Sequence, residues 1–138
     1  MKRAIIAIST AAAFVLVAPL TRAAAGWYLL IPLVGDYDER AEFLSSYKIL
    51  DAQPLSKWAQ QSAYDSAAEC EAVKDSLIRV EQNFYSKQSA SYIAAVGEKG
   101  KDAALLKHMR RTAERSNANI NALTASRCIK SDDPRLGK

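Results

Sequence analysis

The chain has 138 residues and a formal net charge of +4, from 19 lysines and arginines against 15 acidic side chains. Three of the basic residues and none of the acidic ones lie in residues 1–25, which leaves residues 26–138 with 16 basic and 15 acidic side chains. This near-neutral balance gives no reason to expect a nucleic-acid partner. A single histidine excludes metal sites and catalytic mechanisms that need several histidines.

The first 25 residues have the layout of a secretory signal peptide. Lys2 and Arg3 give a positive start, residues 4–20 are almost wholly apolar, and the alanines at 23–25 suit a signal peptidase. We therefore expect residues 1–25 to be cleaved. Residues 26–138 would then form a single mature domain in the periplasm or outside the cell, with no transmembrane span. The alternative is an anchor that is retained, because the apolar run is only slightly shorter than the roughly 20 residues that span a bilayer.

Short strands are expected in the first third of the mature domain. Residues 26–34 and 47–50 are mostly apolar, and residues 55–64 alternate weakly between apolar and polar side chains. The acidic segment 35–45 predicts an exposed loop. The predicted strands carry three large aromatic side chains, which either pack in the core or form a binding surface: Trp27, Tyr28 and Trp58.

Two helices are expected next. Ser66, with Glu69 three residues later, predicts a capping box at the start of the first helix. Its apolar face is regular up to residue 84, and the polar residues 86–91 leave both a continuous and a broken helix open. The glycines in residues 97–100 predict a turn. Asp102 then caps a second helix, which is followed by a brief strand around residues 128–129.

The two cysteines predict the fold as well as a covalent link. An even number of cysteines in an exported chain favours a disulfide, here Cys70–Cys128, over two unpaired buried thiols. Their midpoint in the sequence is residue 99, inside the predicted turn, so both cysteines fall at the open end of an antiparallel helix pair. The expected fold is α+β: a small antiparallel sheet of two or three short strands packed on an antiparallel helical hairpin, stapled by one disulfide.

Four stretches of the mature chain resemble segments of other proteins. They read GWYLL at 26–30, PLSKW at 54–58, DSAAECE at 65–71 and RCIKSDDPRL at 127–136. These stretches resemble those of small, uncharacterised exported bacterial proteins with no assigned activity. The resemblance implies a bacterial envelope or secreted protein, and it implies no catalytic residue. Residues 35–50 belong to none of the four stretches.

A basic surface is expected on the second helix. Residues 99–115 hold six basic side chains against two acidic ones. The side of the helix opposite Leu106 and Met109 would carry four of them: Lys107, Arg110, Arg111 and Arg115. Such a face could bind an anionic lipid surface, an envelope polysaccharide or an acidic protein. The alternatives are an ordinary solvated face, or pairing with the acidic segment 36–51 inside the fold.

Catalytic motifs give no support for an enzyme. The chain has no G-x-S-x-G, H-E-x-x-H, P-loop or dinucleotide-binding motif, and His108 is expected to be a solvated helix residue. Asp36 and Asp38 lack the glycine and the distal glutamate of a calcium loop, so we expect no metal and no cofactor. The sequence favours a non-catalytic binding or structural accessory domain whose partner is an envelope protein or an anionic surface. The alternatives are an electrostatic binder that uses the basic helix, and a carboxylate-dependent hydrolase that uses loop 35–42.

Overall fold

The computed structural model describes residues 26–98, 100 and 102–137. The predicted signal peptide, its cleavage and the basic residues Lys99 and Lys101 lie outside the described residues. The elements in chain order are β1 (Trp27–Ile31), β2 (Val34–Tyr37), β3 (Tyr47–Ile49), the 3-10 helix η1 (Leu55–Lys57), β4 (Ala59–Tyr64), α1 (Ala67–Val96), α2 (Ala103–Ala125), β5 (Arg127–Lys130) and the 3-10 helix η2 (Pro134–Leu136).

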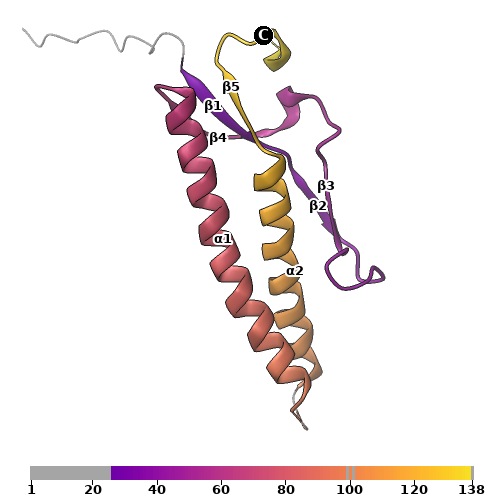
Figure 1. The fold of residues 1–138 in the computed structure, drawn as a ribbon. Helices are drawn as coiled ribbons and strands as arrows, with labels where there is room; N and C mark the ends of the chain where they lie inside the picture. The colour runs from indigo at the N-terminus through magenta and orange to yellow at the C-terminus, as the bar shows by residue number, and fades with distance from the viewer. Residues whose placement is uncertain (1–25, 99, 101, 138) are drawn as a thin grey trace, which may run out of the picture.

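Helices α1 and α2 form the long antiparallel hairpin that dominates the molecule (Figure 1). At the start of α1, the Ser66 hydroxyl accepts the backbone N–H of Glu69, and the Glu69 carboxylate accepts the backbone N–H of Asp65, both at 3.1 Å. Helix α1 continues without a break through residues 86–91, and Asp102 caps α2. The local signals at the helix ends therefore placed both starts correctly.

Small side chains hold the two helices together. The buried alanines of the hairpin are Ala95, Ala113, Ala118 and Ala122. Alanine has the highest helix propensity and lets two backbones approach closely. The weak helix formers between residues 117 and 121 do not interrupt α2, because packing of its apolar side against α1 outweighs their propensity.

A three-stranded antiparallel sheet, in the order β4–β1–β5, crosses the open end of the hairpin (Figure 1). Alternate residues of a strand face opposite sides of the sheet. Leu29 of β1 is fully buried and lies opposite Cys128 of β5, on the side that the helices cover. The other side carries a separate core cluster made of Leu30, Leu55, Trp58 and Ile129.

Two strand predictions and one loop prediction need correction. The predicted strand 26–34 is two strands, because the buried Pro32 has no N–H to donate and the chain leaves the first sheet there. Strand β2 then occupies the start of the predicted loop 35–45. The predicted strand 55–64 begins as a 3-10 helix, so Trp58 precedes β4 and does not lie on a strand.

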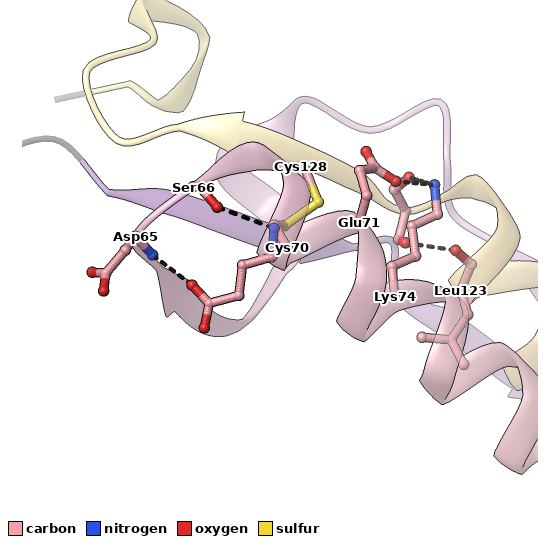
Figure 2. The surroundings of a disulfide bond; sticks show 9 residues. Asp65, Ser66, Cys70, Glu71, Lys74, Leu123 and Cys128 are labelled. Carbon is pink, nitrogen blue, oxygen red and sulfur yellow. Dashed lines mark hydrogen bonds and ion pairs between the residues drawn. A yellow bond between two sulfur atoms is a disulfide. The ribbon is translucent and has the colours of Figure 1, made fainter.

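The disulfide ties the first turn of α1 to strand β5 (Figure 2). Cys70 and Cys128 are bonded through their Sγ atoms at 2.05 Å, and Cys70 is fully buried. Nearby, Lys74 Nζ donates a 3.0 Å hydrogen bond to the backbone carbonyl of Ser126, where the chain leaves α2. The predicted disulfide and the predicted α+β fold are both confirmed.

A second, two-stranded ribbon of β2 and β3 packs on α2. Figure 1 shows it beside α2 on the side away from α1. Its pairing continues beyond the strands through two backbone bonds, from Leu50 N to Leu33 O at 2.9 Å and from Asp38 N to Ser46 O at 2.8 Å. Helix α2 is therefore held between α1 and the β2–β3 ribbon.

Neither α1 nor α2, the two long helices of the described chain, contains a segment apolar enough to cross a bilayer.

Candidate binding groove on helix α2

The β2–β3 ribbon presents two tyrosine rings to two arginines of α2. Tyr37 and Tyr47 lie opposite each other on the two strands, with ring centroids 5.2 Å apart. The guanidinium carbon of Arg111 lies 4.6 Å from the centroid of Tyr37, and that of Arg115 lies 5.2 Å from the centroid of Tyr47. Residues four apart on a helix are neighbours on its surface, so the two arginine–tyrosine contacts lie side by side. Both are cation–π contacts.

These two arginines retain their hydrogen-bonding capacity. Neither Arg111 nor Arg115 forms an ion pair or a side-chain hydrogen bond with any residue that the structure describes. Both side chains are exposed. A guanidinium group offers five N–H donors in a planar array, which suits a carboxylate or a phosphate.

The other two members of the predicted basic face are used inside the fold. Arg110 Nε donates to Glu114 Oε1 at 3.0 Å, and its Nη2 donates to the carbonyl of Ala41 at 3.2 Å. The bond to Glu114 raises the pKa of Arg110. Lys107 pairs with Glu39 at 2.7 Å, and this bond lowers the pKa of Glu39. Pairing with the acidic segment 36–51, one of the two alternatives for the basic face, therefore applies to Lys107, whereas Arg110 pairs with Glu114 of its own helix and contacts the segment only through the Ala41 carbonyl.

Glu114 fixes the loop that joins β2 to β3. Its side chain is completely buried, and Oε1 also accepts the backbone N–H of Leu44 at 3.3 Å. The second oxygen, Oε2, accepts no well-aligned hydrogen bond from the described residues. Burial, and then the neighbouring Glu114 carboxylate, raise the pKa of Tyr37. The sequence analysis considered Glu114 only as one of the two acidic side chains in residues 99–115. The four-residue spacing between Arg110 and Glu114 was the one feature of the sequence that could have indicated this ion pair.

A groove of about 440 Å³ runs along α2 between the ribbon and α1. Tyr47 of β3 lines one side, and Glu81 and Phe84 of α1 line the other. The α2 side chains that line it include Lys107, His108, Arg111, Arg115, Ser116 and Asn119. The groove therefore joins three of the four predicted basic residues to side chains that sequence analysis did not single out.

Glu81 gives the groove an acidic side. Its Oε1 accepts hydrogen bonds from Ser116 Oγ at 2.7 Å and from Asn119 Nδ2 at 3.3 Å. Glu81 forms no ion pair with any described residue, and the two neutral donors hold its carboxylate in place. The groove thus has cationic donors towards the ribbon and an anionic acceptor towards α1.

The three predicted aromatic residues do not form one surface. Trp58 is 7% exposed and its Nε1 donates to the carbonyl of Gln53 at 2.9 Å, so it belongs to the core. Tyr28 packs against the same cluster. Trp27, the residue before Tyr28 in β1, faces the opposite side of the sheet. None of the three lines the groove on α2.

Two carboxylates of the predicted loop 35–42 serve local structure. Asp38 Oδ1 accepts the backbone N–H of Arg40 at 2.9 Å, and Glu39 pairs with Lys107. Within residues 26–98, 100 and 102–137, no group of three or more histidine, cysteine or acidic side chains is arranged to hold a metal ion.

The geometry defines a disulfide-bridged α+β domain with a groove of mixed charge on its second helix. No family model matches the chain, and comparisons with curated proteins and with solved structures give no significant match.

Proposed function

We propose that the protein is an exported, non-catalytic binding domain of the bacterial envelope that holds an anionic ligand in the groove on α2. The observation that carries the proposal concerns Arg111 and Arg115. Each guanidinium group lies against a tyrosine ring, and neither forms an ion pair with an acidic side chain that the structure describes. Arginine N–H groups form strong, oriented hydrogen bonds to carboxylates and phosphates. The groove volume also lies within the roughly 300–1,000 Å³ typical of small-ligand sites.

A groove ligand fits this geometry better than a flat membrane surface. Arg110 is drawn into the fold by Glu114 and Lys107 is paired with Glu39, so the four basic residues do not present one even face. The remaining donors line a concave site. Export is supported by the disulfide, since such bonds persist in oxidising compartments, and by the predicted signal peptide.

A test measures binding of fluorescently labelled dextran sulfate by anisotropy, at low and at physiological salt. The wild-type chain should bind, and binding should weaken as salt rises. The double variant Arg111→Ala/Arg115→Ala should bind at least about tenfold more weakly, because it loses charge-assisted hydrogen bonds.

The matched control is Arg79→Ala/Arg127→Ala. It removes the same total charge. It also removes a cation–π contact, because the guanidinium carbon of Arg127 lies 5.5 Å from the centroid of the Trp58 ring. The control should bind as the wild type does. If both double variants lose binding equally, the interaction follows net charge and the proposed groove site is wrong.

A further inference from the structure

The groove offers two kinds of hydrogen-bonding group on opposite sides. Arg111 and Arg115 are donors next to the ribbon, whereas Glu81 on α1 is an acceptor held by Ser116 and Asn119. A carboxylate accepts hydrogen bonds and repels a second anionic group. The site therefore suits a ligand with an anionic group at one end and neutral hydroxyl donors at the other.

An apolar ring borders the same space. Phe84 is 44% exposed and lies on the α1 side of the groove, three residues after Glu81. An aromatic face gains from covering an apolar surface such as the C–H face of a sugar ring. Val80, one turn earlier on α1, is 62% exposed but does not line the groove.

Building on the proposed function, we propose that the ligand is an acidic saccharide, a sugar bearing a carboxylate or phosphate group beside free hydroxyls. The anionic group binds Arg111 and Arg115, the hydroxyls donate to Glu81, and the ring covers Phe84. A bare inorganic anion would use the arginines alone. A ligand with anionic groups along its whole length, such as dextran sulfate, would still bind the two arginines, but it would place another anionic group against the Glu81 carboxylate.

Isothermal titration calorimetry on the oxidised mature chain can test this with three soluble probes. Glucose 6-phosphate carries one anionic group on a hydroxylated ring, inorganic phosphate carries the anion without a ring or hydroxyls, and glucose carries the ring and hydroxyls without the charge. Glucose 6-phosphate should bind about tenfold or more tightly than either control, since it alone satisfies both sides of the groove. Equal affinity for glucose 6-phosphate and inorganic phosphate would overturn the proposal.

Two variants locate the selectivity. Phe84→Ala should weaken glucose 6-phosphate binding about threefold or more and leave phosphate binding unaffected, whereas the control Val80→Ala should change neither. Glu81→Gln keeps an oxygen for Ser116 and Asn119 but removes the charge that strengthens its hydrogen bonds to the sugar hydroxyls. Glucose 6-phosphate binding should therefore weaken, phosphate binding should not, and the preference for the saccharide should narrow. If neither Phe84→Ala nor Glu81→Gln changes the preference, the saccharide assignment is wrong.

The two proposals fail in different ways. If dextran sulfate binding needs Arg111 and Arg115 but no probe preference appears, the anion site stands and the saccharide assignment falls. If dextran sulfate binding does not need the two arginines, the proposed function itself is wrong, whatever the probes show.

Discussion

Arg110 and Glu114 form a 3.0 Å ion pair in which the carboxylate is completely buried and the arginine side chain is 30% exposed. Glu114 also accepts the Leu44 N–H, and Arg110 also donates to the Ala41 carbonyl. One turn of α2 thereby fixes the loop between β2 and β3. The same ribbon carries the two tyrosines that contact Arg111 and Arg115. The Arg110–Glu114 pair therefore supports the groove without lining it.

Arg110→Ala should lower the free energy of unfolding by about 3 kcal/mol, because it leaves the Glu114 carboxylate buried without its cation. Arg111→Ala, the next residue on α2, should cost less than about 1 kcal/mol, since it removes one cation–π contact at an exposed site. Urea unfolding followed by circular dichroism measures both values. Equal losses in the two variants would contradict a special role for Arg110.

Leu44 adopts a left-handed backbone conformation, with φ of +72°. A side chain with a Cβ atom is disfavoured there, whereas glycine is not. We expect Leu44→Gly to be at least about 1 kcal/mol more stable than Leu44→Ala, the reverse of the usual order of these two residues. Thermal and urea unfolding of the two variants provide the comparison, and an alanine variant that is the more stable would show that Leu44 carries no strain.

The disulfide closes a loop between residues 58 positions apart. In the chain-entropy treatment, removal of a link over this length costs about 4 kcal/mol of folding free energy. Cys70→Ala/Cys128→Ala should show this loss in urea unfolding, and the reduced wild-type chain should match the variant. A loss below about 1 kcal/mol would mean that the helix hairpin and sheet hold together without the link.

Asp133 and Arg135 form a pH-sensitive pair near the C-terminus. The Arg135 guanidinium, and then its backbone N–H, lower the pKa of Asp133 from 3.8 to about 2. A carboxyl group whose folded pKa is depressed contributes stability above its ordinary pKa, and that contribution is lost as the pH falls through the folded pKa. The cap that Asp133 provides at the start of η2 should therefore weaken between about pH 4 and pH 2.

NMR titration of the Asp133 side-chain carboxyl carbon gives its pKa directly. In Arg135→Ala the midpoint should move up towards 3.8, because both the charge and the two side-chain hydrogen bonds are gone. A wild-type midpoint near 3.8, or one that does not move in the variant, would contradict the pairing.

The elements that sequence analysis placed well are those with local signals. The Ser66 and Asp102 caps and the glycine turn all depend on residues a few positions apart. The predicted apolar face of α1 is only partly buried, since Val80 is 62% and Phe84 is 44% exposed. Cys70 and Cys128 are distant in sequence, but with only two cysteines in the chain they were the one possible intramolecular disulfide, and the predicted hairpin favoured it over two unpaired thiols.

The strand boundaries were less predictable because short apolar runs fit more than one structure. Residues 26–34 have one composition, yet they divide between two sheets at Pro32. Trp58 lies in an alternating segment, but it leaves the strand pattern to fill the core beside Leu55. Tertiary packing decides such cases because the local preference of a short strand is weak.

The amino-acid sequence by itself determined the helical hairpin, its caps and its staple, since each follows from nearby residues or from a unique pair. Only the tertiary structure decided what the basic residues of α2 do. Their roles depend on partners about 70 residues away, such as Ala41 for Arg110 and Glu39 for Lys107, which helical periodicity cannot reveal. Packing of the β2–β3 ribbon on one side of α2 turned Arg110 inward and left Arg111 and Arg115 on the groove, because a side chain's function depends on which surface its neighbours cover.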